Sequence, residues 1–211
     1  MHMRTFARRF KHFLHDESGV IVVEGLFILP LIIWALVAMF IYWDVFRTIN
    51  VTQKATYSIA DLLSRQRDTI PLSFANGLQN IANFLTPGGH DVSLRITSFE
   101  CVSPASPTQP GVSQPCDDTR GTYRLLFSYS PGNKALPLIE ANIQGWKMTR
   151  GPILNNGDAV FVVESSVEFT TQMKSVLAGF RVGVDDGTYG NFVVTRPRHR
   201  RLCLEGTNTC N

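Results

Sequence analysis

The most apolar stretch of the chain lies near its N-terminus. Val20–Trp43 reads VIVVEGLFILPLIIWALVAMFIYW, and its last 19 residues carry no charge. As an α-helix this stretch would be roughly 36 Å long, whereas a bilayer core is roughly 30 Å thick. A cleavable secretory signal would be shorter and would end in small residues. This stretch instead ends in Tyr42 and Trp43, which are typical of a membrane interface, so the pattern predicts a membrane-spanning helix.

The charges on either side of the apolar stretch predict its orientation. Asp44 follows it directly, and only Arg47 and Lys54 are basic in the next dozen positions. Because basic residues concentrate on the cytoplasmic side of a membrane, we expect a cytoplasmic basic leader over 1–19, a transmembrane helix over 20–43 and a domain beyond the membrane over 44–211. The basic residues that precede the stretch are Arg4, Arg8, Arg9 and Lys11.

The helical pattern continues past the apolar stretch. Apolar and threonine side chains recur every three or four residues, which predicts one long helix from about Val20 to Leu63. Pro30 either kinks this helix for packing between subunits or is simply tolerated within it. A second helix is predicted over Leu72–Leu85 and stopped by Thr86-Pro87-Gly88-Gly89. The stripe of the long helix consists of Val45, Ile49, Thr52, Thr56, Ile59 and Leu63.

The rest of the chain alternates between apolar and polar residues as strands do. Such alternation suits an antiparallel sheet with one covered face. The long connections 134–156 and 172–186 could hold a short helix each, the first around Leu136–Trp146. The predicted fold class is α+β: a long N-terminal transmembrane helix, then a small domain with an antiparallel sheet packed on one or two helices. The four predicted strands cover Val92–Thr97, Tyr123–Tyr129, Phe161–Phe169 and Tyr189–Thr195.

The four cysteines form two local pairs in the sequence. Cys101 and Cys116 flank a stretch rich in Pro, Ser, Gln and Gly, and Cys203 and Cys210 lie near the C-terminus. We predict two local disulfides, Cys101–Cys116 and Cys203–Cys210, which is one of three possible connectivities. An exported domain lies in a compartment where disulfides persist. Free thiols or a zinc site are the alternatives, although zinc ligands usually come in closer pairs.

Composition and motifs narrow the class of function. Apolar residues make up 44% of the chain and charged residues 18%, which is too apolar for a disordered chain. A net charge of +3 is too small to predict nucleic-acid binding. The sequence contains none of the common catalytic or nucleotide-binding motifs. We therefore expect no enzyme activity, no metal or cofactor, and no small-molecule substrate.

One cluster of basic residues stands out near the C-terminus. It consists of Arg196, Arg198, Arg200 and Arg201, with His199 among them. The cluster could dock an acidic partner subunit, anionic lipid headgroups or cell-wall polymer. A solvated basic turn is the alternative interpretation.

The junction between leader and apolar stretch resembles a type IV prepilin signal. The stretch Asp16-Glu17-Ser18-Gly19 precedes VIVVEG, and a long apolar run interrupted by Pro30 follows. This context resembles the TadE/TadF-like pseudopilins of the tight-adherence (Flp) pilus system. The resemblance implies cleavage by a prepilin peptidase between Gly19 and Val20, which would make Glu24 the fifth residue of the mature chain. Gly25 departs from the aromatic residue that pilins of this system usually carry after the Glu.

Glu24 is the one ionisable residue within the apolar stretch. It either reaches the cytoplasmic interface or is kept for a partner charge. Cleavage after Gly19 would free an α-amine of pKa near 7.7–8.0, which is mostly protonated at neutral pH and could pair with Glu24 of a neighbouring subunit. Such a pair would set the axial register of assembly.

The resemblance implies a pseudopilin-like minor component of tight-adherence pilus assembly. Its expected partners are the membrane, other pilus-assembly subunits and the prepilin peptidase. Its expected location is the bacterial inner membrane, with the C-terminal domain in the periplasm. The alternative is an uncleaved, membrane-tethered periplasmic module that binds cell-envelope polymer or mediates adhesion. The mature N-terminus distinguishes the two.

Overall fold

A computed structural model describes residues 19–86, 91–104, 114–117, 119–147, 149–170, 175–177, 180–182 and 187–207. These residues belong to two compact units. The first contains residues 19–44 and the short strands β4 (Ser175–Leu177) and β5 (Phe180–Val182), which pair antiparallel. The second contains residues 45–170 and 187–207, which include the main sheet. The helix α2 (Val20–Ser64) contributes its first half to one unit and its second half to the other.

The predicted long helix is confirmed, because α2 runs unbroken for 45 residues with Pro30 inside it. Its first half exposes most of its large apolar side chains: Phe40 is 66% exposed and Trp43 is 70% exposed. One 18-residue window of the helix has a mean hydropathy of 2.5, and only 6% of that window is buried. The helix is therefore long and apolar enough to cross a membrane.

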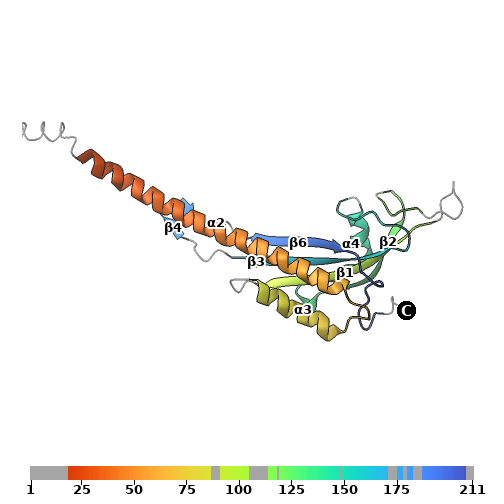
Figure 1. Cartoon of the computed structure of the whole chain (residues 1–211). Helices are drawn as coiled ribbons and strands as arrows, with labels where there is room; N and C mark the ends of the chain where they lie inside the picture. Colours follow the sequence, from red (N-terminus) through yellow and green to blue (C-terminus); the bar gives the residue numbers. More distant parts are fainter. Residues whose placement is uncertain are drawn as a thin grey trace, which may run out of the picture. The chain divides into compact units, whose positions relative to one another are not determined.

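The second unit is built on a four-stranded antiparallel sheet (Figure 1). The strand order is β2–β1–β3–β6, so the two long central strands β1 and β3 pair with each other and each also pairs with one edge strand. The predicted α+β class and all four predicted strands are confirmed. The bounds are β1 (Val92–Val102), β2 (Thr122–Tyr129), β3 (Ala159–Phe169) and β6 (Gly187–Thr195).

The second half of α2 and the helix α3 (Leu72–Leu85) contribute to the larger hydrophobic core, against one face of the sheet (Figure 1). The predicted stripe of α2 is buried here except for Ile49, which is half-buried, while Thr48 is fully buried. Phe161 and Val163 of β3 belong to the same core. Ile70 and Leu204 also belong to this core, and a parallel β-bridge pairs their segments.

The opposite face of the sheet is also covered, which differs from the expected single covered face. The short helix α4 (Glu140–Trp146) packs there, and its Trp146 contacts the ring of Phe99 with centroids 6.0 Å apart. The continuous apolar run of β3, Ala159–Val163, explains the difference, because a strand buried on both faces carries apolar residues without alternation.

A β-bulge divides β2 between the two cores. Ser98 pairs with Phe127 and Phe99 pairs with Leu125, so Leu126 is an extra residue in β2. An extra residue reverses the alternation beyond it. Tyr123 and Leu125 therefore belong to the core under α4, whereas Phe127 belongs to the core under α2 and α3.

The expected helices in the two long connections need correction. The first helix, expected around Leu136–Trp146, is present but begins only at Glu140. Pro137 disfavours the helical conformation at Leu136, and the short turn η3 (Pro131–Asn133) precedes the helix. In the connection 172–186 the expected helix is wrong: the described residues form β4 and β5 instead. Their β-branched and aromatic residues, such as Val176 and Phe180, favour strands.

Candidate functional site

The predicted cleavage site lies at the beginning of α2. Gly19 is exposed, and a Cβ atom placed on it would have nothing within 4 Å. Val20 is the first residue of α2, and Glu24 follows one turn later with its side chain exposed. Gly25 also has open space around it. The basic leader 1–18 lies outside the described residues, so processing stays a prediction.

The basic cluster near the C-terminus makes ion pairs with α2, with β1 and with the residue before β3. Arg196 lies 3.2 Å from Asp158, Arg198 lies 2.8 Å from Asp61 of α2, and Arg201 lies 3.2 Å from Glu100 of β1. The backbone N–H of Arg198 also donates to the carbonyl of Ser64, the last residue of α2. Three of the four arginines thus hold the C-terminal segment against the domain.

A broad cleft of about 820 Å³ lies beside this basic cluster. Arg200 and His199 are exposed along it, and Arg67 joins them from the segment that follows α2. Asp68, Glu100 and Asp158 also line the cleft, so its lining has only a small net positive charge. The cleft is large enough for an anionic group of a partner. Two interpretations of the basic cluster therefore stay open: docking of such a group, and a solvated basic turn.

Two surface carboxylates of the second unit have lowered pKa values. A hydrogen bond from Arg65 is the main reason that the pKa of Asp61 lies below its usual 3.8, and Arg198 lowers it further. The pKa of Asp117 is lowered mainly because the backbone N–H of Thr119 donates to it at 2.9 Å. Both carboxylates are therefore charged at neutral pH and hold local structure.

One of the two predicted disulfides is present among the described residues. Cys101 and Cys116 are joined, with their Cα atoms 5.8 Å apart. Both are fully buried in the core under α4, and a β-bridge pairs Cys116 with Leu154. Cys203 is also in a disulfide, but its predicted partner Cys210 lies outside the described residues. Disulfides are typical of proteins that fold outside the cytoplasm.

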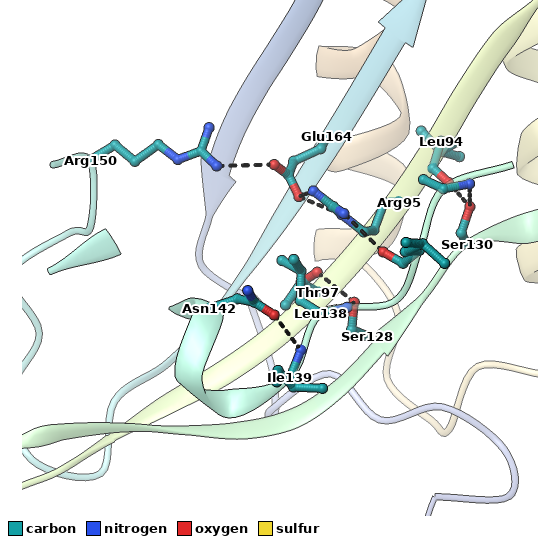
Figure 2. Close-up of polar contacts among 12 residues, drawn as sticks. Leu94, Arg95, Thr97, Ser128, Ser130, Leu138, Ile139, Asn142, Arg150 and Glu164 are labelled. Carbon is teal, nitrogen blue, oxygen red and sulfur yellow. Dashed lines mark hydrogen bonds and ion pairs between the residues drawn. The ribbon is translucent and has the colours of Figure 1, made fainter. Parts of the chain in front are cut away.

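The structure brings together a polar site that the sequence did not predict, on the sheet face that also carries α4. Figure 2 shows Glu164 of β3 held between Arg95 of β1 and Arg150. Arg95 donates to the Glu164 carboxylate at 2.7 Å and to the carbonyl of Leu136 at 2.9 Å. The Arg150 guanidinium lies 3.4 Å from the other Glu164 oxygen. We call the hollow around this group the arginine–glutamate pocket.

The arginine–glutamate pocket has a volume of about 340 Å³ and is lined by both polar and apolar groups. The hydroxyls of Ser93 and Ser166 line it beside the charged group, and Phe192 forms an apolar wall. The Arg150 guanidinium lies over the Phe192 ring, 4.2 Å from its centroid, and 4.9 Å from that of Trp146. The full lining is Ser93, Arg95, Ala135, Arg150, Glu164, Ser165, Ser166, Gly190, Asn191 and Phe192.

Hydrogen bonds fix the segment between β2 and α4 beside this pocket (Figure 2). The Ser130 hydroxyl donates to the carbonyl of Leu94 at 2.7 Å and accepts from the N–H of Ala135 at 3.0 Å. The Ser128 hydroxyl accepts from the N–H of Leu138 at 2.9 Å. These contacts hold Ala135 and the Leu136 carbonyl at the pocket, so the hollow is built into the fold.

The sequence contained little signal for this pocket. Glu164 lies on the face of its strand opposite Phe161 and Val163, where alternation alone would predict an exposed side chain, yet its side chain is only 14% exposed. Arg95 faces Glu164 only because of the register between β1 and β3, in which these two residues are direct partners. An Arg and a Glu at matching positions of two predicted strands are the only trace that a sequence could show. Within the described residues, no three His, Cys, Asp or Glu side chains gather as metal ligands would.

Comparison with protein-family models, with characterised proteins and with solved structures found no match for this chain. The functional argument therefore rests on the architecture. A long apolar N-terminal helix continues into a helix that packs on a four-stranded antiparallel sheet, and this is a pilin-like arrangement.

Proposed function

We propose that this chain is a pseudopilin-like minor component of a tight-adherence pilus machinery. In this proposal the first half of α2 inserts into the bacterial inner membrane, the sheet domain (the second unit, residues 45–170 and 187–207) lies in the periplasm, and a prepilin peptidase cuts after Gly19. The role is structural, with no reaction assigned to the chain. The observation that carries the proposal is the composition of α2, which is apolar and exposed in its first half and amphipathic and packed on the sheet in its second.

The exposed first half of α2 needs an apolar environment. Leaving one large apolar side chain in water rather than burying it costs roughly 1.5–3 kcal/mol, and this half exposes many of them. Lipid or the helices of neighbouring subunits would remove that cost. The Cys101–Cys116 disulfide supports a domain outside the cytoplasm.

Glu24 supports the assembly role. A charge at the centre of a span costs roughly 2.5–3.5 kcal/mol, and one close to its edge costs less. A protonated α-amine on Val20 of a neighbouring subunit would offset this cost. The open space at Gly25 would let another helix approach closely beside Glu24.

Processing is tested by the mature mass of the chain in a host that expresses the prepilin peptidase. We expect a wild-type chain that begins at Val20 and a Gly19→Val chain that keeps its leader, because a bulky side chain at this position blocks access to the peptide bond. Gly25→Ala is the matched control, since Gly25 also lies in open space, and it should be cut normally. Identical masses for wild type and Gly19→Val would contradict processing at this site.

Assembly is tested by Glu24→Ala. This substitution should leave cleavage intact and reduce piliation strongly, because the partner amine loses its counter-charge. Glu140→Ala removes an exposed carboxylate from α4 of the sheet domain and should leave piliation unchanged. Wild-type piliation of the Glu24→Ala strain, counted by electron microscopy, would remove the role proposed for this residue.

The broad cleft beside the basic cluster favours the second candidate, an uncleaved and membrane-tethered module that binds an anionic envelope polymer. Arg67 and Arg200 would supply the positive charge. The same mass measurement separates the candidates, because this module keeps its leader in a host with active peptidase.

A further inference from the structure

We propose that the arginine–glutamate pocket binds a sugar acid: one hydroxyl-rich residue that carries a carboxylate, such as a uronic acid. The inference concerns the sheet domain and does not depend on whether α2 is processed. It rests on the size of the pocket, its net charge, the free edge of Arg150 and the polar groups around it.

The size of the pocket suits one ligand residue. Pockets for small molecules typically have volumes of about 300–1,000 Å³, and this one, at about 340 Å³, lies at the lower end. Hydrogen bonds from Ser128 and Ser130 hold the neighbouring segment in place, so the hollow exists without a ligand. A preformed hollow lowers the entropic cost of binding.

The charge of the pocket favours an anion. Two arginines face a single carboxylate, so the group carries one net positive charge. The side chains of Glu164 and Arg95 are only 14% and 20% exposed, so the excess charge is weakly screened by water. A carboxylate that enters the pocket would neutralise the group.

Arg150 is the arginine that is available to a ligand. Arg95 already uses its N–H groups on Glu164 and on the Leu136 carbonyl. Arg150 is 46% exposed, and its contact with Glu164 is long, at 3.4 Å. Because its planar face rests on Phe192, its guanidinium edge is already oriented, and such an edge binds a carboxylate through two parallel hydrogen bonds.

The other polar groups favour a sugar acid over an acidic peptide side chain. Ser93 and Ser166 contribute hydroxyls to the lining, on the same face of the sheet as Arg95 and Glu164. An aspartate side chain entering the pocket would fill only part of it and would leave these groups without ligand partners. The hydroxyl groups of a sugar ring can donate to and accept from them while the sugar carboxylate meets Arg150.

The test is a calorimetric titration of the full chain in detergent micelles with glucuronate, glucose and N-acetylaspartate. We expect saturable binding of glucuronate and at least roughly tenfold weaker binding of the other two, since one lacks the charge and the other the hydroxyls. Absence of saturable glucuronate binding, or equal binding of glucose, overturns the proposal. Tighter binding of N-acetylaspartate overturns the saccharide assignment in favour of an acidic peptide.

Variants locate the binding in this pocket. Arg150→Gln should weaken glucuronate binding roughly tenfold, and Arg150→Lys should weaken it less, because the charge stays while the paired donors are lost. Ser166→Ala keeps the charge and should cost a few-fold in affinity. Arg65→Gln, which removes an exposed arginine directly after α2 and outside the pocket, is the control and should bind as wild type. Unchanged affinity in both Arg150→Gln and Ser166→Ala overturns the assignment.

Discussion

At the residue scale, a chain of buried hydroxyl groups joins α2 to the sheet. The Asn191 amide donates to Ser165 at 3.3 Å, and the Ser165 hydroxyl lies 2.6 Å from that of Thr56. Thr56 donates in turn to the carbonyl of Thr52 at 2.7 Å, and the Thr52 hydroxyl donates to the carbonyl of Thr48. Each hydroxyl therefore has a partner inside a core that excludes water, and the chain fixes how α2 lies on β3.

Replacing Thr56 with valine tests this chain of hydrogen bonds. Valine keeps the shape of the side chain but leaves the buried Ser165 hydroxyl without its acceptor, so we expect a loss of about 1–2 kcal/mol in the free energy of unfolding. Ser58→Ala removes the same kind of helical hydroxyl–carbonyl bond at an exposed position and should change stability by less than about 0.5 kcal/mol. Thermal unfolding in detergent, followed by near-UV circular dichroism, measures both. Equal stabilities for the two variants would contradict the account.

At the element scale, the sequence predicted α2, α3 and the four strands of the main sheet, but not the register in which these strands pair. The period of apolar residues predicted α2 and α3 because each helix packs one face on the sheet. The bulge at Leu126 shows in the sequence only as a run of three apolar residues, Leu125–Phe127, which does not by itself distinguish a bulge from a strand buried on both faces. The pairing of Arg95 with Glu164 joins residues 69 positions apart, and only the strand register brings them together.

The disulfide between β1 and the segment before β2 should stabilise the domain. It closes a loop with a sequence separation of 15, for which chain entropy predicts a contribution of about 3 kcal/mol. We expect Cys101→Ala/Cys116→Ala to lose about that much in the free energy of unfolding, measured by urea titration. Under reducing conditions, which also break the disulfide of Cys203, the variant and the wild type should have similar stabilities. A variant as stable as the oxidised wild type would show that the loop is held by other contacts.

At the scale of the whole molecule, the surfaces of the two units differ in chemical character. The first exposes apolar side chains along the first half of α2, whereas the second buries two hydrophobic cores and carries ion pairs on its surface. This contrast was predictable, because a long uncharged run followed by amphipathic patterns shows directly in the sequence. The pockets were not, since they depend on contacts between distant segments.

The central claim is that the first half of α2 anchors the chain in a membrane and that the sheet domain lies on the periplasmic side of this membrane. Proteinase K treatment of intact spheroplasts, followed by mass analysis of the membrane fraction, tests it most directly. We expect the sheet domain to be digested and a protected fragment containing Val20–Trp43 to remain in the membrane, while a cytoplasmic marker protein stays whole. Full-length chain that survives until the spheroplasts are lysed, or that is recovered in solution without detergent, would contradict the account.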